Sequence, residues 1–154
     1  MPRRSAGLLV YRFRGGRLEV LIAHMGGPLW ATKDAGAWTI PKGEYGDEEP
    51  LAAAVREFRE EIGQDPPGGR TLDLGEVRQG SGKRVRVFAR EGDLDPATVV
   101  SNTFTMQWPP RSGRMAEFPE IDSAQWATPD RAREALISGQ AAAIDALEAI
   151  LGGR

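Results

Sequence analysis

The segment from Pro41 to Gly63, PKGEYGDEEPLAAAVREFREEIG, constrains the fold more than any other part of the sequence. If successive residues turn by about 100° around a helix axis, three apolar residues fall within about 40° of Leu51: Val55, Phe58 and Ile62. Three acidic residues fall on a different face: Glu57, Glu60 and Glu61. The pattern predicts a helix over residues 51–62 that packs on a core with one face and gathers carboxylates on another.

These carboxylates lie three and four residues apart, a spacing that brings like charges together and destabilises a bare helix. They also lie toward the C-terminal end of the helix, where the helix dipole disfavours anions. A divalent cation would turn the repulsion into attraction, and the glycine-rich stretch Lys42–Gly46 lets the backbone approach a ligand closely. The alternative is a solvated acidic face with Arg56 and Arg59 as counter-ions.

The composition limits the metals and partners that this helix can serve. The sequence has no cysteine and one histidine, His24, so a bound metal must be a hard cation held by oxygen. The net charge of −2 gives no basis for binding a nucleic acid duplex or a membrane surface. No apolar run approaches the roughly 20 residues of a membrane span, and the expected location is the cytoplasm.

The 154 residues suit one domain over residues 1–154. Strands are predicted over six ranges: 5–13, 18–25, 38–41, 72–79, 84–90 and 123–127. Helices are predicted over three ranges: 51–62, 129–137 and 141–151. Turn residues at 14–17 and 80–82 predict two hairpins, whereas residues 91–113 are predicted to form an irregular loop. This order of elements predicts a mixed α/β fold.

The acidic helix and its glycine turn resemble the signature of the Nudix hydrolases, in which a glycine precedes an Arg-Glu pair and a Glu-Glu pair. The chain supplies these residues in the family's order: Gly43, Arg56, Glu57, Glu60, Glu61 and Gly63. The flanking stretches Trp38–Gly43 and Ile121–Trp126 also suit the family. The resemblance implies a Nudix-type α/β/α sandwich with a mixed, largely antiparallel sheet.

One further glutamate of the signature lies between the glycine and the helix, and two residues compete for this position. Glu48 has the family's seven residues before Arg56 but only four after Gly43, where the family has five. Glu49 restores the five but leaves six before Arg56. We favour Glu48, because Pro50 suits the first helical position and makes Glu49 the cap residue.

The resemblance implies hydrolysis of a pyrophosphate bond in a nucleoside diphosphate linked to another group X, with Mg²⁺ or Mn²⁺ and an attacking water. Divalent ions neutralise and orient a pyrophosphate and acidify water, and phosphoryl transfer needs little beyond such positioning. The expected substrates are small nucleotides, namely nucleoside triphosphates or dinucleoside polyphosphates. ADP-ribose and coenzyme A are expected to be poor substrates, because the sequence carries no motif for either.

The resemblance also implies roles for individual residues. Glu57, Glu60 and Glu61 would hold the metal and supply the general base, which stays unassigned among them. Arg56 would orient Glu57 by a bidentate ion pair, and Glu48 would be a further ligand. The backbone carbonyl of Lys42 or Gly43 would complete the metal shell. A last carboxylate is expected from Glu120, six residues before Trp126, with Glu117 as the alternative.

The candidate substrate-binding residues mix cations with one aromatic ring: Lys83, Arg84, Trp108, Arg111 and Arg114. The cations would hold a phosphate chain and Trp108 would stack on a base. The alternatives are an exposed strand face for Lys83 and Arg84, and contacts with the protein's own surface for the other three.

Two other functions compete with catalysis. One is a non-catalytic Nudix-fold module that binds or senses a nucleotide, and the other is a scaffold with an acidic helix. The intact Arg56-Glu57 and Glu60-Glu61 pairs argue against the sensor, and the shortened loop after Gly43 is its one support. Oligomeric state stays open, although a homodimer would be common among relatives.

Overall fold

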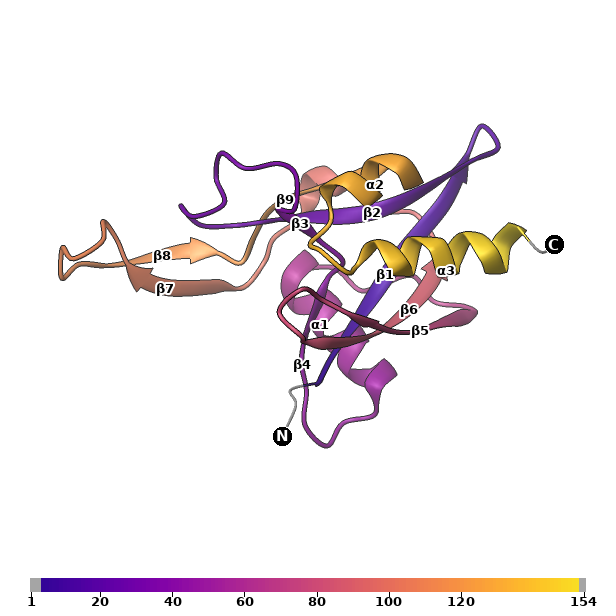
Figure 1. Ribbon diagram of the computed structural model, residues 1–154, viewed down its shortest axis with the longest axis horizontal. Helices are drawn as coiled ribbons and strands as arrows, with labels where there is room; N and C mark the ends of the chain where they lie inside the picture. The colour runs from indigo at the N-terminus through magenta and orange to yellow at the C-terminus, as the bar shows by residue number, and fades with distance from the viewer. Residues whose placement is uncertain (1–3, 153–154) are drawn as a thin grey trace.

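The computed structural model describes residues 4–152 and arranges them as a mixed sheet with helices on both faces (Figure 1). The strands are β1 Arg4–Arg14, β2 Arg17–Met25, β3 Trp38–Thr39, β4 Lys42–Glu44, β5 Thr71–Arg78, β6 Arg84–Glu91, β7 Thr103–Gln107, β8 Met115–Pro119 and β9 Ile121–Ala127. The helices are α1 Pro50–Ile62, the 3₁₀ helix η1 Pro96–Thr98, α2 Pro129–Ala135 and α3 Ala141–Gly152. The main sheet has the order β3-β2-β1-β6-β5, and it confirms the predicted α/β class.

The central strand β1 pairs with neighbours on both sides. It runs antiparallel to β2 as far as Arg14 and Arg17, and the turn between them uses Gly15 and Gly16 at φ 58° and 78°. Glycine adopts this left-handed region without steric cost. On its other side β1 runs parallel to β6, and β6 pairs antiparallel with β5. Both predicted hairpins are therefore confirmed.

The sheet separates two apolar clusters, because successive side chains of a strand point to opposite faces. One cluster joins Leu8 and Val10 of β1 to Phe58 and Ile62 of α1. The other joins Leu9 of β1 to α2 and α3 through Leu136, Ile144 and Leu147. Burying a side chain such as Phe58 contributes roughly 1.5–3 kcal/mol, so its apolar stripe anchors α1 on one face of the sheet.

The stretch predicted as a glycine turn ahead of α1 is a short strand, β4. Gly43 lies opposite Ala6 of β1, and Lys42 lies opposite Gly7. The N–H of Leu8 donates to the carbonyl of Pro41 over 3.1 Å. Backbone groups along the buried start of β1 need hydrogen-bond partners, and this stretch supplies them. Lys42 and Gly43 are therefore fixed next to α1.

The predicted irregular loop over residues 91–113 is wrong in its second half. Residues 103–107 and 115–119 form the hairpin β7–β8, with Phe104 opposite Phe118 and Met106 opposite Ala116. These four side chains are half-buried, whereas the residues between them are exposed, which is the alternation of a strand. The hairpin projects from the body as an arm (Figure 1). We call it the β7–β8 arm.

The two C-terminal helices agree with the prediction to within two residues at their ends. Pro129 occupies the first turn of α2, and the hydroxyl of Thr128 accepts a hydrogen bond from the N–H of Arg131 over 3.2 Å. This is a common N-cap arrangement. Across residues 4–152, the structure has no helix with the length and apolar character needed to cross a bilayer.

Candidate active site

The acidic helix α1 is held by a proline at its start and a glycine at its end. Pro50 lies in its first turn and Glu49 at its N-cap, but the Glu49 side chain makes no capping hydrogen bond. Gly63 ends the helix at φ 79°, and its N–H donates to the carbonyl of Arg59. A Cβ on Gly63 would lie 2.2 Å from the carbonyl oxygen of Val100, so glycine is needed there for both reasons.

Glu57 points from α1 onto the backbone of β4. A Cβ built on Gly43 would lie 2.0 Å from the carboxyl carbon of Glu57, so the carboxylate occupies the space that any side chain would take. The absence of a Cβ at Gly43 is therefore what lets strand and helix approach each other here. Burial is the largest influence on Glu57 and raises the pKa of its carboxyl group, and the neighbouring Glu60 acts in the same direction.

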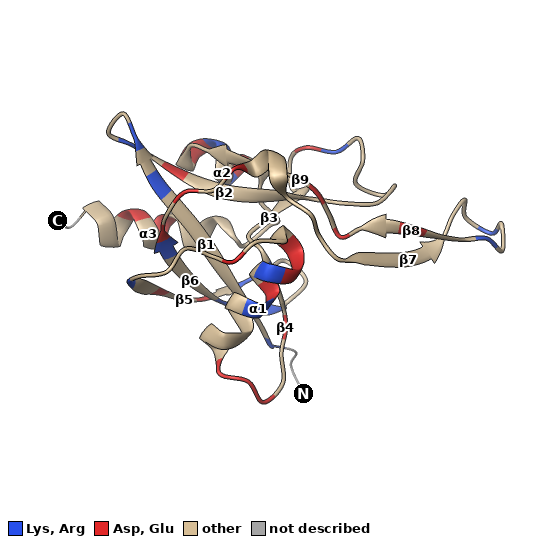
Figure 2. Cartoon of the chain, turned by 180° about the vertical axis from the view of Figure 1, so that it is seen from behind, with Lys and Arg blue, Asp and Glu red and all other residues tan. Residues whose placement is uncertain are grey.

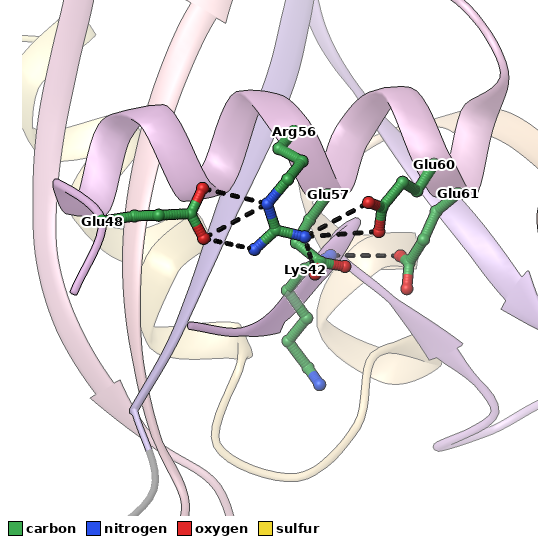
Figure 3. A network of polar contacts seen from close by, with 6 residues as sticks. All are labelled: Lys42, Glu48, Arg56, Glu57, Glu60 and Glu61. Carbon is green, nitrogen blue, oxygen red and sulfur yellow. Dashed lines mark hydrogen bonds and ion pairs between the residues drawn. The ribbon is translucent and has the colours of Figure 1, made fainter. Parts of the chain in front are cut away.

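Arg56 connects the acidic residues of the signature (Figure 3). Its Nε and Nη2 atoms donate to both carboxylate oxygens of Glu48, at 3.0 Å and 2.7 Å. Its Nη1 donates to Glu57 at 2.7 Å and to Glu60 at 3.3 Å. The prediction of a bidentate pair with Glu57 is therefore wrong, because the planar fork of Arg56 faces Glu48 and only one nitrogen reaches Glu57. Arg59 turns away and pairs with Asp65 at 2.6 Å.

Glu61 is buried, with 9% of its surface exposed, although the helical pattern places it on an acidic face. One carboxylate oxygen accepts a hydrogen bond from the backbone N–H of Lys42 at 3.1 Å. Burial raises the pKa of Glu61 to about 8, against the smaller opposing effects of Lys42. A buried carboxyl group with so little positive charge around it argues against a merely solvated acidic surface.

A hollow of about 210 Å³ opens next to Glu61. It is lined by apolar, aromatic and polar residues: Met25, Gly26, Trp30, Thr39, Lys42, Glu61, Phe104, Glu120 and Ile121. Sequence reasoning missed Trp30 and Phe104, which come from a loop and from the β7–β8 arm. Trp30 could have been found as an aromatic residue in a glycine-rich loop, and Phe104 from the alternation of apolar and polar residues over 103–107.

The structure brings some of the predicted site residues together and separates others. Glu120 lines the same hollow as Glu61, whereas Glu117 lies exposed on β8 of the arm. Lys83 pairs with Glu44 at 3.2 Å beside β4, and Arg84 lies 3.8 Å from Glu76 on β5. The other three predicted substrate-binding residues lie at the outer turn of the arm, away from α1 (Figure 1): Trp108, Arg111 and Arg114.

The residues of α1 fit a hard divalent cation by their chemistry. Glu57, Glu60 and Glu61 supply oxygen donors only, and burial raises the pKa of Glu57 and Glu61, so a nearby cation would stabilise their ionised forms. No ready-made cluster of three or more ligand side chains exists within residues 4–152, and the guanidinium of Arg56 stands among the carboxylates instead. The Lys42 ammonium points away from the carboxylates of α1 (Figure 3).

Glu48 and Glu49 are expected to differ sharply when each is changed to glutamine. Glu48→Gln removes the carboxylate that orients Arg56, and we expect turnover to fall by roughly one to three decades. Glu49→Gln should change turnover by less than about twofold and stability by less than about 0.5 kcal/mol, since its side chain makes no cap bond. Steady-state rates and thermal melts of both variants check this, and the reverse ranking would assign the signature position to Glu49.

A family model described as NUDIX domain matches residues 1–147 of the chain. A search of curated proteins found no match. Among solved structures, the Ap4A hydrolase of C. elegans in a binary complex is similar with a TM-score of 0.66 and 20% identity, over 97% of this chain and 99% of that one.

Two other solved structures share the fold. The NUDIX domain of Shewanella oneidensis NrtR, complexed with ADP ribose, has a TM-score of 0.64 at 11% identity, over 98% of this chain and 89% of that one. The Nudix hydrolase RenU from M. smegmatis has a TM-score of 0.58 at 24% identity, over 97% and 85%. With the family model matching residues 1–147 and the signature on α1, the chain belongs to the Nudix hydrolase family and is a pyrophosphohydrolase of that family.

Proposed function

We propose that this protein hydrolyses a pyrophosphate bond of a nucleoside triphosphate or a dinucleoside polyphosphate with the help of Mg²⁺ or Mn²⁺. The observation that carries the proposal is the position of Glu61. Its buried carboxyl group lies beside Glu57 and lines a hollow together with Trp30 and Phe104. A site for a nucleotide needs these two parts side by side, namely carboxylates for cations and aromatic faces for a base.

The chain's own residues prepare the carboxylates for this role. Arg56 holds Glu48 and Glu57 in fixed orientations, and the N–H of Lys42 holds Glu61. Glu57, Glu60, Glu61 and Glu120 would bind the cation together with the backbone carbonyl of Lys42 or Gly43. A bound cation would supply neutralisation of the phosphate chain and acidification of a water molecule. One of the glutamates would then take the proton of the attacking water.

The hollow supports a nucleotide with weak base preference. Trp30 and Phe104 offer faces on which any base can stack. Thr39 also lines the hollow, but its hydroxyl is already engaged, because it donates to the carbonyl of Ile40 at 2.8 Å. Lys42 also lines the hollow, and burial lowers the pKa of its ammonium group. The similar Ap4A hydrolase, named for a dinucleoside tetraphosphate, is consistent with this substrate class.

The alternative is a module that binds a nucleotide without cleaving it. The observation that favours it is the comparable similarity to the NUDIX domain of NrtR complexed with ADP ribose. The complete set of signature residues on α1 favours catalysis. Binding without any turnover in the presence of Mg²⁺ would support the alternative.

A panel of nucleotides tests the proposed substrate class. We expect nucleoside triphosphates or dinucleoside polyphosphates to be cleaved to shorter nucleotides with Mg²⁺ and to stay intact with EDTA, which chromatography of the products measures. Preference among bases should stay below about tenfold, which corresponds to roughly 1.4 kcal/mol. A kcat/KM for ADP-ribose above that of every triphosphate and polyphosphate tested would overturn the substrate class and leave the family assignment intact.

Two tryptophan variants form a matched pair within the same panel. Trp30→Leu should raise KM about tenfold if the base stacks in the hollow, because stacking on one ring contributes roughly 1–3 kcal/mol per base. Trp108→Leu changes the same residue type at the outer turn of the arm and should leave KM within about twofold. The opposite ranking would move the base from the hollow to the arm.

A further inference from the structure

The β7–β8 arm is a two-stranded sheet that pairs with no other strand among residues 4–152. An isolated two-stranded hairpin is only marginally stable in water, and each of its edges presents backbone N–H and C=O groups that lack strand partners. In Figure 1 the arm extends well beyond the main sheet, so both of its edges lie away from the body over most of their length.

The hydrogen bonds at the two ends of the arm determine which backbone groups point outward. The N–H of Glu120 donates to the carbonyl of Asn102, and the N–H of Trp108 donates to the carbonyl of Arg114, both at 2.9 Å. In an antiparallel pair, hydrogen-bonded and non-hydrogen-bonded residues alternate. The backbone groups of every second residue therefore face away from the hairpin: Thr103, Thr105 and Gln107 on β7, and Met115, Glu117 and Pro119 on β8.

The two edges differ in their ability to accept another strand. The β8 edge carries Pro119, which has no N–H, and the charged side chain of Glu117, and both are features that protect an edge from pairing. The β7 edge carries two threonines and a glutamine, without charge or proline. Threonine also favours extended backbone. The β7 edge is therefore the one that is open to pairing.

We propose that two copies of this chain pair through the β7 edge, antiparallel and centred on Thr105, to form a four-stranded sheet. In this register Thr105 lies opposite the partner's Thr105, and Thr103 lies opposite the partner's Gln107. Every outward N–H of the edge then meets a carbonyl, and the facing side chains are uncharged. Pairing of the β8 edges about Glu117 would instead place two like charges opposite each other.

The charges of the arm favour the antiparallel arrangement with a second copy. The outer turn is basic, with Arg111 and Arg114 exposed (Figure 2). Acidic residues lie at the base of the arm: Glu120 directly follows β8, and the carbonyl of Glu60 on α1 accepts a hydrogen bond from the N–H of Asn102. Antiparallel pairing places the basic turn of each copy near the acidic base of the other. Because a single strand pair buries a small area, we expect a dissociation constant between roughly tens and hundreds of micromolar.

Proline at one edge or the other tests the proposal. Thr105 and Glu117 face each other in the hairpin, and the N–H of each points outward, so neither Thr105→Pro nor Glu117→Pro removes a hydrogen bond within the arm. In sedimentation equilibrium up to about 1 mM protein, the wild type and Glu117→Pro should reach the mass of two 16.7 kDa chains. Thr105→Pro should stay at the mass of one chain. Thr105→Lys should also stay monomeric, because two lysines would face each other across the interface. This second variant keeps the test valid if Thr105→Pro does not fold.

Hydrogen exchange gives a second readout on the unmodified protein. The amides of Thr103, Thr105 and Gln107 should exchange more slowly as the protein concentration rises, whereas those of Met115 and Glu117 should not change. A wild type that stays monomeric at the highest concentration, dimeric Thr105 variants, or a Glu117→Pro variant that is monomeric like Thr105→Pro would each overturn the proposal. These measurements use no substrate, so they stand apart from the proposed catalytic function.

Discussion

Glu61→Gln is expected to abolish turnover and, without metal, to make the protein more stable than the wild type above about pH 5. The folded pKa of Glu61 is about 8, well above the value of 4.5 for an unhindered glutamate. The folded protein therefore holds a proton that the unfolded chain releases between these two values. Stability from this group is fully present below pH 4.5 and is lost as the pH rises toward 8. Glutamine mimics the protonated form and removes the loss.

Thermal melts in EDTA between about pH 5 and 9 measure this effect. The melting temperature of the wild type should fall relative to that of Glu61→Gln across this range, and Mg²⁺ should restore the wild type at the alkaline end. Glu49→Gln is the matched control and should follow the wild type, because Glu49 is exposed and its side chain makes no cap bond. Turnover of Glu61→Gln within about threefold of the wild type would exclude Glu61 from the catalytic machinery.

Gly43→Ala is expected to lower kcat/KM by at least about a hundredfold, although only one methyl group is added. The new Cβ would meet the carboxyl carbon of Glu57 at 2.0 Å and one carboxylate oxygen at the same distance. Either the glutamate must leave its position beside Arg56, or β4 and α1 must separate. Both changes displace the carboxylate on which catalysis depends.

Gly46→Ala, three residues along the chain and just beyond β4, provides the control, because a Cβ there meets no atom within 4 Å. Its kcat/KM should stay within about twofold of the wild type, and its stability should be equal or higher, since alanine restricts the unfolded chain more than glycine does. Circular dichroism and kinetics on both variants make the comparison. Equal activities for Gly43→Ala and Gly46→Ala would show that Glu57 is free to move without loss.

The sequence was sufficient for the elements whose patterns are local. The 3.6-residue spacing of apolar residues and the proline at position 50 predict α1, and the structure places the helix over Pro50–Ile62. Hairpins with glycine turns, such as β1–β2, were predicted for the same reason. The β7–β8 arm was missed because Trp108-Pro-Pro110 and Gly113 indicate a loop, whereas the strands on each side are only five residues long.

The parts of the site that the sequence did not predict depend on contacts between distant segments. A helical wheel treats Glu61 as exposed, and only the approach of β4, 19 residues earlier, buries it against the Lys42 backbone. The preference of Arg56 for Glu48 over Glu57 likewise depends on how the loop before α1 returns to the helix. Trp30 and Phe104 meet in one hollow although they are far apart in the sequence, and no periodicity links them.

The division of the core by the sheet has a consequence for how this protein can evolve. The side chains that anchor α1, among them Phe58 and Leu8, belong to one apolar cluster, whereas Ile144 and Leu147 of α3 belong to the other. The sheet lies between the two clusters. Substitutions beneath α3 are therefore screened by selection for overall stability, while those beneath α1 are also screened for the alignment of the glutamates. Homologues should diverge faster beneath α3, at side chains such as Ile144 and Leu147 that do not line the hollow.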